Sequence, residues 1–523
     1  MTTGAREDGR GRTLSLLAWA AIATAVLLRL LFLARKPFWS DEAWVALLAQ
    51  GPTGDLLATR SPTPPGFLLI VKGCTYLPWL DPEVAYRLPL IAAGIATVLL
   101  LPRLARALGA SRDTALVALL LAAALPALVH YSRELKHYGL DALLATAFPL
   151  AALRFFPPRG GADLAPHGRG TRALPALLAA AAPWLAYGSV FPVGATLGWG
   201  WIQAFRSRLP GRRAWWAVAS LAFACSLVVL YYFFLRRQAG NPNLQSHWRH
   251  PIQSLQEMGP VFGLGAALLR YLEVSFSYVF TGFSPAAGAL AAVGLALWPR
   301  EGRGTLAILA GAAAVAACAA AVTGRYVIVM GRFLLFAAPL LILMVAGGLT
   351  GISRLAAGRL APRLARAAPL AAAAALCAFW SFRAIEQRVH PERATWPIAF
   401  RYDNLIDVPG LIARAVERRA PGEAVLVAAR ISRPFRLYAR GRLGDAEVVR
   451  SPGDFDDPAG TTAAWNRVPR WLAGVPGRGW ILLAAGDESR RLREAVAAAG
   501  FTVVSRWASR GAVLLEVVRE PRP

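Results

Sequence analysis

Two adjacent acids follow the first long apolar run and are the first candidates for chemistry. Ser40 is a good helix N-cap, so Asp41 and Glu42 are predicted to lie in the first turn of a helix. A carboxylate at this position could take a proton from a hydroxyl group. A second interpretation stays open, because acids also favour helix N-termini through the helix dipole alone.

A second cluster of ionisable groups lies between two later apolar runs, at residues 131–141. If this connector is helical, its acids and aromatic groups share one face and its two cations share another. Asp141 already enters the apolar run, where an acid is costly and usually functional. The candidate binding residues of this cluster are Arg133, Glu134, Lys136, His137 and Tyr138. A solvated charge cluster at the membrane edge is the alternative.

Other cations lie at or near the ends of apolar runs. Arg87 opens the second apolar run and Arg332 opens a late one, and both are candidate binding residues together with the weaker Arg325. Lys72 stands among apolar neighbours, so it fits a phosphate contact or a side chain that snorkels to the surface.

The loop 241–252 contains His247 and His250, which could close over a bound group or act as interfacial anchors beside a Trp. The two histidines stand at i and i+3 with no paired acid nearby, which is a weak metal pattern. A divalent metal is therefore left open as a cofactor, and no metal ligand is assigned. Arg and Lys side chains could supply the same positive charge.

Long apolar runs must position these residues. The chain has 523 residues, of which 56% are hydrophobic, and a mean hydropathy of +0.44. About eleven runs are long enough for a helix that crosses a membrane, which takes roughly 20 residues. This recurrence argues against buried helices of a soluble protein. The predicted spans lie near residues 14–34, 88–104, 114–130, 139–156, 173–189, 190–205, 215–235, 268–298, 305–322, 332–350 and 367–383.

The placement of arginine predicts the topology, because cytoplasmic connectors are enriched in Lys and Arg. With the N-terminus in the cytoplasm, every inner connector is basic and the acids at residues 41, 42, 55, 81 and 83 lie outside. The same pattern accounts for most of the net charge of +27, so it argues against nucleic-acid binding. The predicted location is the bacterial cytoplasmic membrane.

The composition changes after residue 383. Short apolar runs at 424–429, 480–485, 501–504 and 512–518 predict strands, and 488–499 predicts a helix that ends at Gly500. We therefore predict a mainly α, polytopic membrane domain at 1–383, with interfacial helices in its first outer loop at 35–87. A small extracytoplasmic α/β domain follows at 384–523.

The order of several motifs resembles the membrane glycosyltransferases of GT-C fold. Within them, the chain is most similar to the protein O-mannosyltransferase and aminoarabinose-transferase group, including bacterial relatives that decorate lipopolysaccharide. The resemblance covers about residues 14–350 and is strongest at 36–141. Its motifs are Asp41-Glu42, Thr63-Pro64-Pro65-Gly66, Arg87-Leu88-Pro89, the segment 131–138 and Arg332-Phe333-Leu334-Leu335. Thr63 stands where many relatives have His, and Lys136 where Arg is more frequent.

This resemblance implies a polyprenyl-phosphate sugar donor and an inverting transfer to an extracytoplasmic lipid, glycan or protein. Asp41 is the candidate base, and Glu42 is predicted to orient the acceptor or a second group. The cations would neutralise the departing lipid phosphate. The alternative is a transporter or flippase of a lipid-linked saccharide, which should show paired half-repeats and breaks near the midplane. A non-catalytic scaffold would leave the two charged clusters unexplained.

Overall fold

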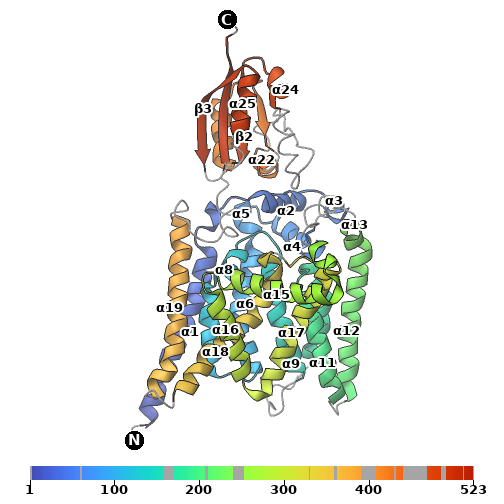
Figure 1. Ribbon diagram of the computed structural model, residues 1–523, viewed down its shortest axis with the longest axis vertical. Coiled ribbons are helices and arrows are strands. Elements are labelled where there is room, and N and C mark those ends of the chain that lie inside the picture. The colour runs from blue at the N-terminus through green and yellow to red at the C-terminus, as the bar shows by residue number, and fades with distance from the viewer. Residues whose placement is uncertain are drawn as a thin grey trace.

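The computed structural model describes most of the chain, and within the described residues the protein is mostly helical with one small sheet near the C-terminus (Figure 1). This agrees with the predicted fold class. The described residues are 3–58, 62–156, 169–206, 210–239, 253–328, 330–357, 362–389, 408–428, 431–439, 468–484, 490–509 and 512–521.

Long helices form a bundle at one end of the molecule (Figure 1). They are α1 (Thr3–Leu30), α6 (Leu88–Ala107), α7 (Arg112–Ala124), α9 (Tyr138–Phe155), α10 (Arg169–Leu185), α11 (Val190–Arg206), α12 (Pro210–Leu230), α15 (Gly259–Val279), α16 (Ser284–Leu297), α17 (Arg300–Val322), α18 (Ala338–Ala356) and α19 (Pro362–Val389). Shorter elements connect or cap them, namely η1 (Leu33–Arg35), α2 (Ser40–Gln50), α3 (Thr53–Ala58), α4 (Pro65–Cys74), α5 (Pro82–Ala85), α8 (Pro126–Tyr131), η3 (Tyr231–Leu235), α13 (Arg236–Ala239) and η4 (Gly331–Ala337).

Seven helices of the described chain are long and apolar enough to cross a membrane, or eight if one bent pair counts as a single span. The predicted number of eleven spans is therefore not confirmed. Each predicted segment does contain a helix, but some are short. Helix α7 has 13 residues and ends before Pro126, because the residue before a proline is disfavoured in helical conformation.

The segment predicted as one long span at 268–298 forms two helices, α15 and α16, which meet at 111°. Gly282 lies between them with φ of 83°, a left-handed conformation that favours glycine. The predicted span at 268–298 is therefore a bent pair of helices, broken near Gly282. In Figure 1, α15 runs across the bundle while α16 follows its length.

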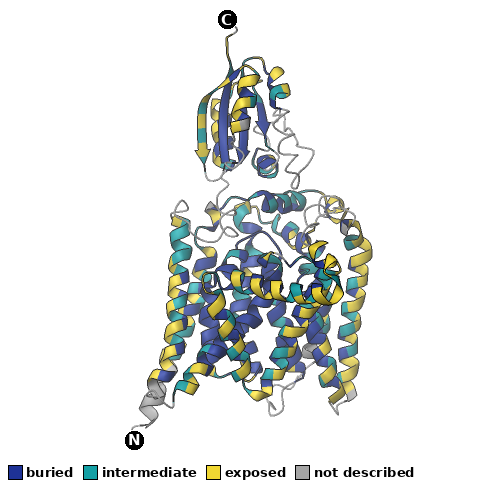
Figure 2. Ribbon diagram, in the orientation of Figure 1, coloured by how far each residue is buried: buried dark blue, intermediate teal, exposed yellow. Residues whose placement is uncertain are grey.

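Burial separates the centre of the bundle from its edge (Figure 2). In an apolar stretch of Gly331–Ala356, which contains α18, 89% of the residues are buried, whereas in a stretch of Gly211–Gln238, which contains most of α12, the share is 11%. Helix α16 packs on α18 through Gly294, where an added Cβ would lie 1.8 Å from the carbonyl oxygen of Met344. Close approach through a small residue is typical of helix pairs in membranes, where apolar side chains gain nothing by leaving lipid.

A four-stranded sheet with the order β1-β2-β4-β3 forms the C-terminal domain. Strands β1 (Ala424–Val427) and β2 (Arg478–Ala484) are parallel, and β4 (Ala512–Arg519) runs antiparallel to both β2 and β3 (Phe501–Ser509). The strands predicted from apolar runs are confirmed, as is the helix before Gly500. The helices are α21 (Val408–Arg418), α22 (Ser432–Tyr438), α24 (Val468–Ala473) and α25 (Arg490–Ala498).

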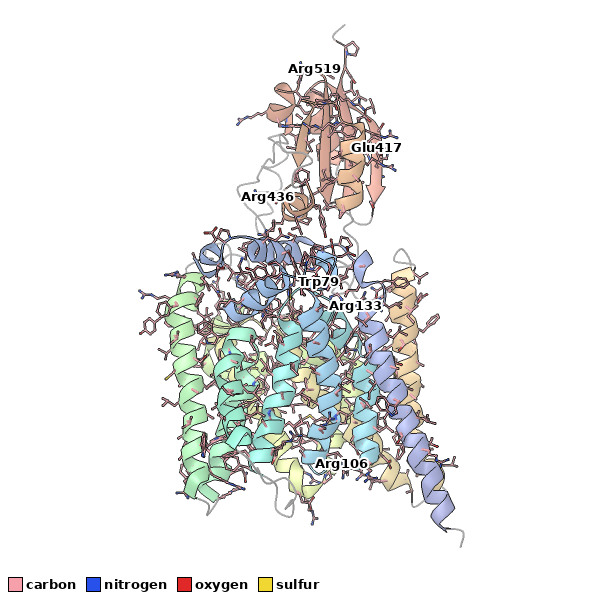
Figure 3. The ribbon with its side chains drawn as sticks, turned by 180° about the vertical axis from the view of Figure 1, so that it is seen from behind. Trp79, Arg106, Arg133, Glu417, Arg436 and Arg519 are labelled. Carbon is pink, nitrogen blue, oxygen red and sulfur yellow. The ribbon has the colours of Figure 1, made fainter. Side chains whose placement is uncertain are left out.

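The C-terminal domain sits on one end of the bundle, with α2, α4 and α5 between them, while the N-terminus lies at the other end (Figure 1). Arg106, in the last turn of α6 beside a connector that we predict to be cytoplasmic, lies at the end far from the C-terminal domain (Figure 3). Helix α19 continues to Val389, past the predicted domain boundary at residue 383.

Candidate active site

Helix α2 presents the two adjacent acids, and both lie in its first turn as predicted. The helix begins at Ser40 and its N-cap is Trp39, so the prediction that Ser40 forms the cap is wrong. The amide of Trp39 instead donates to Oε2 of Glu42 at 3.4 Å, which satisfies a donor that the helix itself cannot pair. Helix α2 packs on α4, whose start is fixed by Pro65 and whose Gly66 lies against the backbone of Trp184.

Three cationic side chains of the described chain surround the carboxylate of Asp41. Its Oδ2 lies 3.6 Å from Nζ of Lys136 and 3.8 Å from Nη1 of Arg332. Its Oδ1 lies 4.0 Å from Nη1 of Arg433. These distances exceed the 2.7–2.9 Å or so of a charge-assisted hydrogen bond, so the cations face the acid without being locked to it.

The charge of Asp41 is stabilised at this position. Burial alone raises the pKa of its carboxyl group, but the charges of Lys136, Arg332 and Arg433 outweigh burial, and the pKa falls below its usual value. Asp41 is therefore a carboxylate at neutral pH. Its side chain remains 23% exposed, so a second molecule can reach it.

Glu42 lies one residue further along α2 and has a different environment. Its Oε1 accepts from Nε of Arg87 at 2.9 Å, and its Oε2 accepts from Nη2 at 2.7 Å. Both side chains are fully buried. The amide of Leu135 donates to Oε1 of Glu42 at 2.7 Å, so the acid also holds the connector that carries Lys136.

The connector from Ser132 to His137 is not helical, so the condition for two separate helix faces is not met there. Within this connector, the amide of Leu135 donates to Glu42, and the amide of Lys136 donates to the carbonyl of Glu134 at 2.7 Å. This tight turn places Lys136 near Asp41.

Arg332 reaches the same carboxylate from η4. The preceding Gly331 packs against the ring of Tyr278, where an added Cβ would lie 1.9 Å from a ring carbon. Tyr326 donates to the carbonyl of Phe333 at 2.6 Å and so fixes the residue after Arg332. Glycine is therefore needed at position 331 for the close approach that places the guanidinium group.

Two further residues of the connector lie beside this cluster. His137 is buried, and burial together with the charges of Lys136 and Arg332 lowers its pKa to about 3, so the ring is neutral. Tyr138 is also buried and interacts electrostatically with Arg332 and Asp41.

The remaining predicted residues are not among the cations that face Asp41. Arg133 donates to the carbonyl of Leu31 at 2.7 Å. Glu134 lies 3.3 Å from Nε2 of His130 and also interacts electrostatically with Arg332. Nζ of Lys72 donates to the carbonyl of Gly51 at 2.7 Å at the end of α2. Arg325 is exposed in the turn after α17. The predicted binding residues His247 and His250 lie outside the described residues.

Arg433 was not predicted from the sequence. It lies on α22 of the C-terminal domain, almost 400 positions after Asp41, where no local pattern marks it as a partner of α2. The short motif around it, SRPFRLY, combines cations with aromatic rings and was the only available signal.

The residues at this site do not fit a metal ion. Asp41 already faces three cations, and both oxygens of Glu42 accept from Arg87. Within the described ranges, no group of three or more His, Cys, Asp or Glu side chains could hold a metal. We therefore derive no chemical step through a metal.

The fold is that of the GT-C membrane glycosyltransferases. ArnT from Cupriavidus metallidurans bound to undecaprenyl phosphate is 14% identical, with a TM-score of 0.52 over 97% of this chain and 98% of that chain. The apo state of the same protein is 13% identical, with a TM-score of 0.54 over 98% of this chain and 98% of that chain. The archaeal oligosaccharyltransferase AglB from Archaeoglobus fulgidus, in complex with an inhibitory peptide and a dolichol-phosphate, is 10% identical, with a TM-score of 0.52 over 93% of this chain and 71% of that chain. No protein-family model and no curated protein matches the chain.

Proposed function

We propose that the protein transfers a sugar from a polyprenyl-phosphate carrier to an acceptor outside the cytoplasm. The observation that carries this proposal is the Asp41 cluster, in which one accessible carboxylate of α2 faces cations from separate segments at the end of the bundle near the C-terminal domain (Figure 1). Solved structures of the same fold hold undecaprenyl phosphate and a dolichol-phosphate, which supports a lipid-phosphate carrier here.

In this proposal, Asp41 is the general base. Its carboxylate takes the proton of the acceptor hydroxyl group while the hydroxyl oxygen attacks the anomeric carbon of the sugar. The bond from that carbon to the phosphate oxygen breaks, and the lipid phosphate leaves with the electron pair. Such a single displacement inverts the anomeric configuration, and a positioned base contributes about 10²–10⁴-fold to the rate.

Lys136 and Arg332 are proposed to neutralise the leaving phosphate. Their nitrogen atoms stand 3.6 Å and 3.8 Å from Asp41, which supports a role for them beyond an internal ion pair. A bound phosphate would share these cations with Asp41. The carboxylate would then lose part of the positive field that lowers its pKa, and it would become a stronger base when the donor is present.

Glu42 and Arg87 are proposed to position the site. In their buried pair, both carboxylate oxygens of Glu42 accept hydrogen bonds from Arg87, and Nη1 of Arg87 also donates to the carbonyl of Lys36 at 2.7 Å. This geometry favours a structural role for Arg87 over the phosphate contact that its motif implied, and for Glu42 over contact with the acceptor.

The topology is proposed from charge. The N-terminus would be cytoplasmic, and the C-terminal domain would lie outside the cytoplasmic membrane. The position of Arg106 at the end far from that domain supports this orientation (Figure 3). The acceptor would then be an extracytoplasmic lipid, glycan or protein.

The test replaces Asp41 with Asn in cells that lack the native gene. Lipid-linked sugars and surface glycans are compared among the deletion strain, the strain with the native protein and the strain with Asp41→Asn. We expect the native protein to restore a glycan modification, and the variant to reduce transfer by about 100-fold or more, as expected for loss of a general base.

The control is Asp55→Asn, which removes an exposed acid of the same outer loop. It should transfer at the native rate. Undiminished transfer by Asp41→Asn, in membranes where the protein is present at native level, would remove Asp41 from the base role. An unchanged pool of lipid-linked sugars and glycans in the deletion strain would contradict the proposed activity itself.

A further inference from the structure

Helix α22 lies in the C-terminal domain but contacts α2 of the membrane part. Its buried Phe435 belongs to the core of the C-terminal domain. Tyr438 packs against that core and also against the core of the helical bundle. A seven-residue helix therefore bridges two hydrophobic cores.

The hydroxyl group of Tyr438 makes two hydrogen bonds across this boundary. It accepts from the amide of Phe38 at 2.7 Å and donates to Oε1 of Glu83 at 2.8 Å. Phe38 leads into α2, and Glu83 lies on α5, whose carbonyl at the same residue accepts from Arg87 at 3.2 Å. Tyr438 thus ties together the two segments that carry the buried Glu42–Arg87 pair.

Arg433 lies on the same helix and reaches the exposed side of α2. Its guanidinium carbon lies 3.8 Å from the centre of the Trp44 ring, and its Nη1 lies 4.0 Å from Oδ1 of Asp41. Asp41 and Trp44 stand at i and i+3, so they share one face of α2. A guanidinium group stacked on an aromatic ring is held in a defined plane and can still bind a phosphate through its edge.

We propose that α22 docks the C-terminal domain on α2 and completes the active site, with Arg433 as a third cation for the phosphate group of the donor. This inference rests on the proposed function. The membrane part alone would then hold Asp41, Lys136 and Arg332 but would bind the lipid phosphate weakly. Tyr438 is a positioning residue, because it acts only by holding α22 in place.

The first experiment measures binding of undecaprenyl phosphate to the purified full chain in detergent. We expect Arg433→Gln to raise the Kd about tenfold, equivalent to roughly 1.4 kcal/mol. The matched control is Arg436→Gln, which removes the same charge from an exposed position on the same helix (Figure 3). The control should leave the Kd within about twofold, a difference well below one factor of ten.

A pH profile separates a charge effect from a loss of packing. The charged and titratable groups around Asp41 are Lys136, Arg332, Arg433 and Tyr138. Removing Arg433 takes away one of the charges that lower the pKa of Asp41, so this pKa should rise. The acid limb of the rate profile should therefore move to higher pH in Arg433→Gln and return toward the native position in Arg433→Lys. An unmoved limb in Arg433→Gln would argue against a charge role.

Docking itself can be measured without activity. The amide hydrogen of Phe38 is bonded to Tyr438, so it should exchange slowly with solvent in the native protein. Tyr438→Phe should speed exchange in the peptide that contains Phe38 and also raise the Kd for undecaprenyl phosphate. Slow exchange together with native affinity in this variant would overturn the positioning role.

The outcomes distinguish this inference from the proposed function. If the native protein does not bind undecaprenyl phosphate, the proposed carrier is wrong, and Arg433 has no phosphate to bind. If the native protein and Asp41→Asn both bind it, and Arg433→Gln binds it equally well, only the role of α22 fails.

Discussion

Helix α2 carries two neighbouring carboxylates that differ in burial and in pairing. Glu42 is fully buried and paired with Arg87 at 2.7 Å. Asp41 is 23% exposed, and its nearest cation, Lys136, stands at 3.6 Å. A single step in sequence therefore separates a closed ion pair from an open one.

This difference supports Asp41, rather than Glu42, as the acid that reacts. A buried pair with full hydrogen bonding has no capacity left for a ligand, and its disruption leaves an uncompensated charge. Nζ of Lys136 and Nη1 of Arg332 stand beyond hydrogen-bonding distance from Asp41, so a new anion could share them. We therefore propose that the Glu42–Arg87 pair positions α2 and the connector, and that the Asp41 cluster meets the substrate.

The largest expected effect on stability comes from breaking the Glu42–Arg87 pair. Glu42→Gln would leave Arg87 buried without its counter-charge, and we expect a loss of about 3–5 kcal/mol in the free energy of unfolding. Thermal unfolding in detergent should show a clear decrease for this variant, whereas Asp41→Asn should unfold near the native temperature. Replacing both partners, as in Glu42→Leu with Arg87→Met, should recover part of the loss. Equal losses for the two acids would contradict the comparison.

A smaller effect, on donor affinity rather than on stability, is expected from removing a cation of the Asp41 cluster. Lys136→Met should raise the Kd for undecaprenyl phosphate about tenfold, close to the lower end of the usual range for a charged hydrogen bond, and should change thermal stability little. Lys136→Arg should keep most of the affinity because the charge remains. Arg103→Gln provides a control, since this exposed arginine bonds within α6 to the carbonyl of Leu99. Native affinity in Lys136→Met would remove this lysine from the donor site.

The smallest effect is expected at Lys72. Its ammonium group bonds to the carbonyl groups of Ala49 and Gly51 at 3.3 Å and 2.7 Å, so it caps the end of α2. Lys72→Met should lower stability by about 0.5–1.5 kcal/mol, the usual net value of a hydrogen bond, without changing donor affinity. A loss of affinity similar to that of Lys136→Met would instead assign Lys72 to the phosphate.

The sequence predicted the elements of the fold better than their geometry. Apolar runs located the helices and four strands because burial follows composition and period. They could not predict the 111° bend between α15 and α16, because it depends on the turn at Gly282 and on packing. They also left open whether the connector at 131–141 is helical, and the structure shows that residues 132–137 are not, where the side chain of Glu42 fixes the amide of Leu135.

The candidate site was predictable only where its residues belong to local motifs. Asp41, Lys136 and Arg332 were selected from their motifs, and the structure brings them together. The same reasoning assigned different roles to Asp41 and Glu42, but it could not predict that both oxygens of Glu42 are paired, because this pairing depends on the distant Arg87. It could not find Arg433, because contact across the two domains leaves no pattern in neighbouring residues.

The contact between α22 and α2 has a consequence for exchanging parts between related proteins. A hybrid that joins this helical bundle to a foreign C-terminal domain would lose the tyrosine and the arginine that meet Glu83, Trp44 and Asp41. A hybrid that keeps residues 432–438 together with residues 35–87 would preserve those contacts. Whether a bundle and a C-terminal domain from two proteins work together should therefore depend more on the contact between α22 and α2 than on the overall similarity of the two proteins.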